Sequence, residues 1–595
     1  MSANAFQTGL FVLVVALLVK PVGTYLERVF ERRQTVLDPV LLPIERVIHW
    51  LVGDDCLREM DWKRYSLAFC VFGVVNIILL YFALRWQIYC PWFFPKVMTT
   101  AMTPDLAANT AVSFAATTTW QAYAGETTMS YFSQLLLVGQ NFLAGAAGLA
   151  VGVAFIRGYA RERTKWLGNF WVDLIRAVLW VLFPVSVVGS LFLIAQGVPM
   201  NFRPYTVANT VQGGMQIIAQ GPVAALEFIK NLGTNGGGFF NANGAHPFEN
   251  PTPLTNFIEL LAIAVIPAAF THTFGRMVGR PREGWVIFWT MTALFIVGLL
   301  VCNWAETRTY PGLATDVLGG NMEGKEVRFG TGASALAAVV TSNGATGSYN
   351  SMDDSFQPLG VAVPLLNMLV GEIIYGGLGT ELYSMIFIAL IALFVGGLMI
   401  GRTPEHLGKQ IGPPEMKIIA LYTLIAPVTV LALTAVAVVT KAGLAGLTTK
   451  SGPHGFTEIL FAYASAFANN GQSMAGLSAN NIFYNTTTII AMLAGRYILA
   501  MLALSLAGLS ANNIFYNTTT IIAMLAGRYI LAVLALSLAG RFAAMSRRPP
   551  SPGTMPSDGF VFGAMLTGTA LLLGALNFLP ALALGPIVEH FSIHS

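Results

Sequence analysis

The stretch Gly233-Thr234-Asn235-Gly236-Gly237-Gly238-Phe239-Phe240-Asn241 lies between two strongly apolar regions of the chain. Three consecutive glycines would break a transmembrane helix, but glycine backbone can adopt dihedrals that turn carbonyl groups toward one axis. Inside a membrane, irregular backbone is tolerated only where it is buried in protein or lines a water-filled cavity. The stretch is therefore either a selectivity-filter strand, whose oxygens replace the water shell of an ion, or an ordinary extracytoplasmic loop.

Composition indicates a membrane protein with many spans. Of the 595 residues, 55% are hydrophobic and only 10% are charged, whereas soluble domains carry about 25% charged residues. The net charge of +4 is too small to indicate nucleic-acid binding. The cysteines show no metal-binding spacing, so we expect thiols rather than a disulfide or metal site, and no cofactor; they are Cys56, Cys70, Cys90 and Cys302.

Apolar segments long enough to cross a bilayer, about 20 residues, recur along the chain. The expected spans cover roughly residues 6–27, 66–88, 130–156, 171–196, 253–275, 285–302, 360–400, 418–440, 484–507, 516–539 and 560–585. Basic clusters at 28–33, 157–165 and 276–282 follow alternate spans, as expected of loops that stay in the cytoplasm. This rule places the N-terminus outside the cytoplasm.

Four segments of one type lie between the outward ends of paired spans. Each joins a semi-apolar stretch, too short to span, to a strand rich in Gly, Thr and Asn. These segments cover residues 106–126, 223–241, 333–348 and 457–476. Their separations of about 110 to 125 residues indicate a fourfold repeat of span, re-entrant pore helix, filter strand and span.

Such a repeat predicts an all-α polytopic membrane protein of about ten transmembrane helices, with a pore on a pseudo-fourfold axis. The C-terminal ends of the pore helices carry partial negative charge and would face a central cation. Carbonyl coordination suits K+, although the residues alone leave Na+ open. The expected units are an N-terminal span and loop at 1–60, pore repeats at 61–165, 166–283, 284–412 and 413–540, and a loop with a final span at 541–595.

Several longer motifs point to one family. They are WQAYAGETTMSYFSQ (Trp120–Gln134), GTNGGGFFNANGAHPFENPT (Gly233–Thr252), NMEGKEVRFG (Asn321–Gly330), GRTPEHLGKQI (Gly401–Ile411) and GPHGFTEILFAYASAFANNG (Gly452–Gly471). These motifs, and nearly the whole chain, resemble the potassium-translocating A subunits of bacterial Kdp P-type ATPase complexes. The resemblance implies the pore fold of the superfamily of potassium transporters, and a chain that selects and conducts K+.

The resemblance also implies partners and a location. A separate P-type ATPase subunit would hydrolyse ATP, in keeping with the lack of a DKTG phosphorylation motif or P-loop in this sequence, so the chain itself would be no enzyme. Two small membrane subunits would complete the complex. The expected location is the bacterial inner membrane, with K+ and the lipid bilayer as further partners and no nucleic acid.

By position, the resemblance implies three filter residues in each repeat. They are Thr118, Thr119 and Gln121; Thr234, Asn235 and Gly236; Thr346, Gly347 and Ser348; and Asn469, Asn470 and Gly471. The first strand departs from the family pattern TNTNWQ at Ala116, Thr117 and Thr119, and Ala468 stands where a third Asn is expected. Because a threonine hydroxyl can replace an amide oxygen, we expect selectivity to survive.

The stretch Gly371–Thr380 interrupts the apolar segment at 360–400. The residues alone allow a simple break between two half-helices. The resemblance implies a discontinuous helix whose loop lies under the filter and restricts passage, with gating candidates Glu372, Gly376, Gly377 and Gly379. Glu372 at membrane depth would then be functional, since intramembrane carboxylates are costly; the alternative is a helix-capping or interfacial role.

Three polar features receive ordinary structural interpretations. Asp173 and Arg176, three residues apart near the end of a span, are expected to form an i,i+3 ion pair. His246 and His454 flank filter segments, and we expect ordinary loop histidines rather than proton sensors.

Residues 475–506 are repeated at 507–538 with a single change, Met501 against Val533. An additional span would invert the final helix and place Arg541 outside, against the rule for basic loops. We therefore expect that one copy is displaced or does not span. Copy one is joined to the fourth filter segment and copy two to the basic loop, so either could occupy the native position.

These patterns favour a potassium-conducting subunit of an ATP-driven uptake complex. The first alternative is a stand-alone potassium permease of the same superfamily, driven by membrane potential, which architecture alone does not separate. The second is a non-transporting scaffold or intramembrane enzyme. Four filter-like segments, and the lack of a catalytic dyad or metal cluster within the expected spans, argue against it.

Overall fold

The computed structural model describes residues 3–53, 58–89, 100–308, 320–401, 403–449, 451–496, 530–546 and 555–594. Its long helices are α1 (Ala3–Phe30), α3 (Trp62–Trp86), α6 (Tyr131–Ala160), α10 (Pro253–Met277), α11 (Pro281–Glu306), α14 (Thr380–Met399), α15 (Pro413–Val439) and α22 (Phe560–Leu582). A ninth span is continuous through α7 (Phe170–Arg176), the π-helical turn η4 (Ala177–Leu182) and α8 (Phe183–Ala195). In the described part of the chain, nine helices are thus long and apolar enough to cross a membrane.

The remaining helices are shorter. They are α2 (Asp38–Val52), η2 (Gln87–Tyr89), α4 (Pro104–Ala115), α5 (Gly125–Thr128), α9 (Val223–Leu232), η5 (Asn243–Ala245), α12 (Gly330–Asn343), η6 (Asp353–Ser355), α13 (Pro358–Leu369), α16 (Lys441–Leu444), α17 (Pro453–Ala468), α18 (Ile482–Arg496), α21 (Ile530–Ala544), η8 (Ala583–Ile587) and α23 (Val588–His594).

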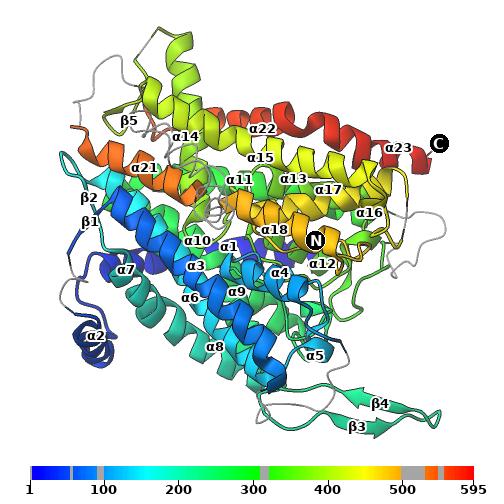
Figure 1. Ribbon diagram of the computed structural model, residues 1–595. Coiled ribbons are helices and arrows are strands. Elements are labelled where there is room, and N and C mark those ends of the chain that lie inside the picture. Colours follow the sequence, from blue (N-terminus) through cyan, green and yellow to red (C-terminus); the bar gives the residue numbers. More distant parts are fainter. Residues whose placement is uncertain are drawn as a thin grey trace, which may run out of the picture.

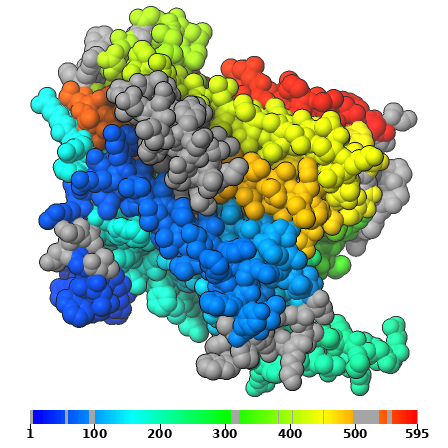
Figure 2. All heavy atoms as spheres, in the orientation of Figure 1, coloured from blue at the N-terminus to red at the C-terminus, as the bar shows by residue number. Residues whose placement is uncertain are grey.

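Among the described residues, three two-stranded antiparallel ribbons accompany the helices. β1 (Met60–Asp61) pairs with β2 (Trp166–Gly168), β3 (Thr206–Asn209) with β4 (Met215–Ile218), and β5 (Glu405–His406) with β6 (Lys409–Gln410). The β3–β4 hairpin projects beyond the helices (Figures 1 and 2).

The outer surfaces of the spans are apolar, as a lipid environment requires. Leu79 and Phe82 on α3 expose 62% and 58% of their surface, and Leu300 on α11 exposes 64%. Such faces would be costly in water over so many helices. The chain is therefore a multi-pass membrane protein, as the composition predicts.

Four units of span, pore helix and span surround a centre. The pore helices are α4, α9, α12 and α17, and each packs against the two spans of its own unit. Each also contacts a span of the preceding unit: α9 meets α6, α12 meets α10 and α17 meets α13, whereas α4 meets α18 of the fourth unit. Figure 1 shows these helices from one side. The contacts close a ring, which confirms the predicted fourfold, all-α architecture.

One predicted ion pair is wrong. Arg157 on α6 binds the carboxylate of Asp173 through Nη1 at 2.6 Å and Nη2 at 3.0 Å. Arg176 instead binds Glu45 of α2, with both contacts under 3 Å. Both pairs are buried, so each charge takes the partner that gives two parallel hydrogen bonds. Spacing along α7 could not reveal partners that come from α2 and α6.

The duplicated stretch contributes one half-helix from each copy. α18 lies in copy one, and α21 begins in copy two at the position equivalent to residue 498, directly beyond the end of α18. The two helices contact each other, and both pack against α15. Together they supply the second span of the fourth unit. Residues 497–529, which hold the rest of both copies, lie outside the described residues.

This arrangement leaves the end of the composite span on the side of the other basic loops. Arg541 on α21 pairs with Glu415 at the start of α15. Lys409 donates to the carbonyl oxygens of Gly158 and Arg161 at 2.9 and 2.8 Å, and also to that of Phe542. The expectation that one copy is displaced or does not span depends on residues 497–529, which lie outside the described residues, so it stays a prediction. Arg547 and Arg548 lie outside the described residues.

Candidate functional site

The four pore helices end in the same backbone turn. A residue with left-handed φ follows each helix: Thr117 (58°), Thr234 (48°), Ala345 (49°) and Asn469 (62°). The N–H of the next residue donates to the carbonyl five residues back, in the pairs Thr118–Ser113, Asn235–Lys230, Thr346–Thr341 and Asn470–Ser465, at 2.9 to 3.2 Å. This is the Schellman pattern, which ends a helix and directs the chain away from it.

The strands that leave these turns, here called the filter strands (residues 116–121, 233–238, 344–348 and 469–472), meet one another in a ring. Gly236 forms a parallel bridge with Gly347. A Cβ on Gly347 would lie 2.7 Å from the carbonyl carbon of Gly471. A Cβ on Gly471 would clash with the carbonyl oxygen of Thr118. Only backbone without a side chain fits at these contacts.

Side chains join the first filter strand to the second. Thr119 Oγ1 donates to the carbonyl oxygen of Asn235. Gln121 accepts from the N–H of Gly238 at 2.9 Å and donates to its carbonyl at 3.0 Å. The ring therefore closes in the order one, two, three, four, one.

The structure brings all twelve predicted filter residues together, although they occupy different positions along the four strands. Thr119 occupies the position that Gly236, Gly347 and Gly471 hold in the other strands, with a φ of 47°. Gln121 and Ser348 lie beyond this level. Thr117 and Ala345 belong to the equivalent turns, and the sequence reading missed both. Their position directly after a pore helix is the signal that would have found them.

The ring lies between two cavities. The inner cavity, about 120 Å³, is lined by Thr117, Thr234, Ala345 and Asn469, one residue from each turn. The outer cavity, about 300 Å³, is lined by Thr119, Gly237, Gly347 and Gly471. Each has room for several water molecules, since a single water needs only about 10–15 Å³. A path from one cavity to the other crosses the four strands.

The interruption between α13 and α14 forms the floor of the inner cavity. Gly371, Glu372, Gly377 and Leu378 line it. Two hydrogen bonds tie this loop to the filter strands: Leu378 N donates to Thr234 Oγ1 at 3.0 Å, and Asn470 Nδ2 donates to Glu372 Oε1 at 2.8 Å. The predicted gating candidates thus lie directly below the ring.

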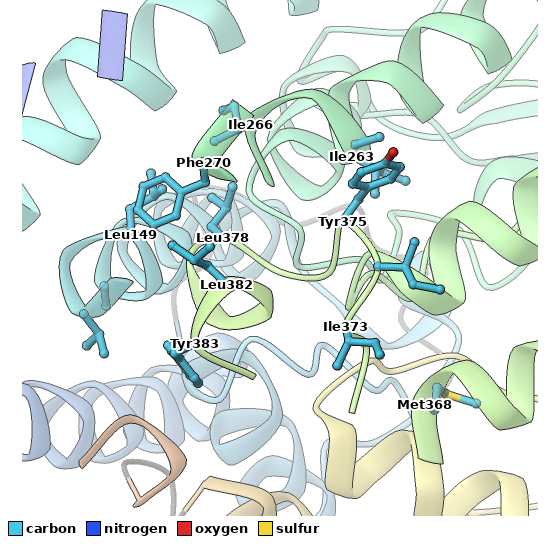
Figure 3. Close-up of a cluster of buried hydrophobic side chains, with 14 of the residues drawn as sticks. Leu149, Ile263, Ile266, Phe270, Met368, Ile373, Tyr375, Leu378, Leu382 and Tyr383 are labelled. Carbon is cyan, nitrogen blue, oxygen red and sulfur yellow. The ribbon is translucent and has the colours of Figure 1, made fainter. Parts of the chain in front are cut away.

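Close packing holds the loop against α6 and α12. A Cβ on Gly376 would clash with the carbonyl oxygen of Asn343, the last residue of α12. Gly379, with a φ of 84°, lies against Gly148 and Gly152 of α6. Figure 3 shows Leu378 among the side chains of Leu149, Ile266 and Phe270. Small residues at helix contacts permit this approach of backbone to backbone.

Buried ion pairs lie behind the ring, and the sequence reading missed them. Lys230 on pore helix α9 contacts Glu227 at 2.6 Å and Glu249 at 2.7 Å, and all three side chains are fully buried. Burial opposes ionisation of Glu249, but Lys230 and the N–H of Phe240 hold its pKa below the ordinary value. A second pair, Lys325 and Glu306, is 2.8 Å apart and likewise buried.

Known proteins resemble this chain over nearly all of its length. "Potassium-transporting ATPase potassium-binding subunit" is the name of two relatives, from Methylorubrum extorquens and Granulibacter bethesdensis. They are 49% and 48% identical to it, and the matches cover 98% and 99% of this chain and 97% and 98% of theirs. The solved potassium transporter TrkH from Vibrio parahaemolyticus aligns with a TM-score of 0.48 at 13% identity, over 83% of this chain and 96% of that one.

A family model described as "Potassium-transporting ATPase A subunit" matches residues 9–509 and again 505–591, so the match restarts inside the duplicated stretch. With nearly the whole chain matched, the protein belongs to the family of potassium-transporting ATPase A subunits.

Proposed function

We propose that this chain binds K+ and conducts it as one subunit of an ATP-driven uptake complex. The ring of filter strands is the selective element, and Thr118, Asn235, Thr346 and Asn470 with their neighbours in the four turns provide its oxygens. The observation that carries the proposal is the fourfold recurrence of one backbone turn between an inner and an outer cavity. The names of the relatives, which describe a potassium-binding subunit, support it.

The physical chemistry of the turns supports a cation of low charge density. Each pore helix directs its C-terminal end, with its partial negative charge, toward the ring. The twelve predicted filter residues are all uncharged, and neutral oxygens can replace the hydration shell of K+ without binding it too tightly to leave. Glu372 and the loop around it restrict passage below the ring, through the bond to Asn470 and that between Leu378 and Thr234.

The family membership suggests a division of labour. A separate P-type subunit hydrolyses ATP, two small membrane subunits complete the complex, and this chain needs no cofactor. In the bacterial inner membrane, the basic loops near Arg161, Lys409 and Arg541 face the cytoplasm. The outer cavity and the N-terminus then face the opposite side.

Growth at limiting K+ tests the proposal. A bacterium that lacks its own potassium uptake would express this chain alone, or with the partner subunits of a close relative. Rescue only in the presence of the partners is expected, and would separate an ATP-driven complex from a stand-alone permease. Rescue by the chain alone would favour the permease. Failure of both, with the chain present in the membrane, would count against potassium uptake itself.

A further inference from the structure

His454 is not the ordinary loop histidine that its position in the sequence predicts. It lies in the first turn of pore helix α17 and exposes only 5% of its surface. Its Nε2 lies 2.6 Å from Asp354 Oδ1 and its Nδ1 lies 2.6 Å from Glu589 Oε1. A histidine with both ring nitrogens held by carboxylates is fixed in orientation, and Nδ1 donates to Glu589.

A second carboxylate, that of Glu458, faces the same place. Glu458 lies one turn beyond His454 on α17 and exposes 2% of its surface. Among the described residues, its Oε2 makes no hydrogen bond of ordinary geometry, and the groups that act on this carboxylate are Asp354 and the backbone of Gly476. Asp354 Oδ1, His454 and Glu458 offer ligand atoms that all lie within 4.8 Å of one another. An oxygen buried without a donor is costly unless a cation or a proton compensates it.

A glycine opens the space that these atoms share. A Cβ on Gly476 would lie 2.6 Å from Glu458 Oε2 and 3.0 Å from Asp354 Oδ1, so both oxygens face its bare α-carbon. The hydroxyl of Thr449 borders the same point and donates to Asp354 Oδ1 at 3.5 Å. The atoms therefore converge on one point rather than dispersing into solvent.

We propose that Asp354, His454 and Glu458 form a binding site for a divalent transition-metal cation such as Zn²⁺. Imidazole nitrogen together with carboxylate oxygen is a donor set that suits this class of ion. A histidine that binds a metal through one ring nitrogen typically donates the N–H of the other to a carboxylate, and this bond fixes which nitrogen binds the ion. Glu589 would be that carboxylate for His454. A cation would take the place of the proton that now bridges Nε2 and Asp354.

The site would join four parts of the chain at the outer side of the ring. Asp354 belongs to η6, shortly after the third filter strand, and Gly476 follows the fourth. His454 and Glu458 begin pore helix α17, and Glu589 belongs to α23 at the end of the chain. A metal there would be a structural cross-link that holds two filter strands and the last helix in register, a role apart from potassium conduction.

Metal content of the purified complex tests this inference. The complex would be treated with a chelator, equilibrated with Zn²⁺ alone, freed of unbound metal and analysed by mass spectrometry. We expect one tightly held zinc per chain in the wild type, and less than a tenth of that in His454→Gln. Glu458→Gln keeps the shape of the side chain and should weaken zinc binding at least tenfold, and Glu589→Gln about 10- to 100-fold.

A matched histidine provides the control. His246 also flanks a filter strand, but it stacks on Phe240 and accepts from the N–H of Phe248. His246→Gln should retain the zinc. Equal zinc in the wild type and Glu458→Gln, or none in the wild type, would overturn the site and leave a hydrogen-bonded cluster. If His454→Gln does not assemble, Glu458→Gln decides alone. Co²⁺ in place of Zn²⁺ should show ligand-field absorption that this variant lacks.

Discussion

The hydroxyl of Thr119 donates a hydrogen bond to the backbone carbonyl of Asn235. In the other three filter strands this position is glycine, and neighbouring strands meet there through backbone alone. Thr119 has a left-handed φ of 47°, as Gly236 and Gly471 have with 85° and 91°, and this backbone costs a residue with a branched Cβ more than it costs glycine. The bond to Asn235 offsets part of this cost, so the threonine that departs from the family pattern itself takes part in the contacts of the ring.

Thr119→Val removes this hydroxyl but keeps the shape of the side chain. A hydrogen bond of this kind contributes about 0.5–1.5 kcal/mol, so we expect a two- to tenfold increase in the apparent KM for K+, with assembly unchanged. Potassium-dependent ATP hydrolysis of the complex would measure it. Thr127→Val, which loses only a bond of 3.3 Å to Ala124 outside the ring, is the control. An unchanged KM in Thr119→Val would show that the hydroxyl does not shape the site.

Gly236→Ala is expected to abolish growth at limiting K+. Gly236 has a φ of 85°, and a Cβ there would clash with the backbone nitrogen of Gly347. Gly213→Ala is a matched control, since Gly213 has a φ of 82° but has nothing within 4 Å of a new Cβ. Both variants bear the strain of a left-handed alanine, about 1–2 kcal/mol, and only one disturbs the ring. Equal growth of the two would argue against the ring as the path of the ion.

Sequence reasoning found what repeats. Spans and pore helices follow from runs of apolar residues and their lengths, and the glycine-rich strands show where helices must stop. Gly236, Gly347 and Gly471 were assigned to the filter by the family resemblance, and the close backbone contacts explain why glycine stands at these three positions. The interruption at Gly371–Thr380 was visible in the sequence itself, from its glycines.

Features that depend on distant partners were not found. Asp173 was paired with Arg176 by spacing, although Arg157 and Glu45 approach from other helices. His454 was read as a loop residue because nothing near it in the sequence indicates Asp354 or Glu589. Ala345 depends on no distant partner, but its side chain carries no chemical signal, and only its position directly after a pore helix would have found it.

Lys230→Met is expected to destabilise the second pore helix. It leaves Glu227 and Glu249 buried without their cation, and breaking a buried pair costs about 3–5 kcal/mol. Adding Glu249→Gln should restore part of the loss. The melting temperature of the purified complex would measure both. If the loss in the double variant equals the sum of the losses in Lys230→Met and Glu249→Gln alone, the two side chains do not stabilise each other.

The same pair predicts how acid acts on the wild type. Because the pKa of Glu249 is lowered, its contribution is fully present above the ordinary glutamate value of about 4.3 and is lost as the pH falls through the lowered pKa. The difference in melting temperature between the wild type and Lys230→Met should therefore be the same at every pH near neutrality. A Lys230→Met effect that disappeared between pH 6 and pH 8 would contradict this assignment.

Deleting residues 507–538 should leave the fold and the site intact. The deletion joins Leu506 to Ala539 and makes one continuous helix from the halves that α18 and α21 now supply, with Met501 in place of Val533. Contacts of both halves are retained: Asn109 still donates to Thr488 at 2.8 Å, and Gly158 still packs against Ala539. We expect growth at limiting K+ equal to that of the full chain.

Deleting 475–506 instead leaves the same helix with valine, so the two deletions should behave alike. Rescue by the full chain but by neither deletion would show that the second copy has a role of its own.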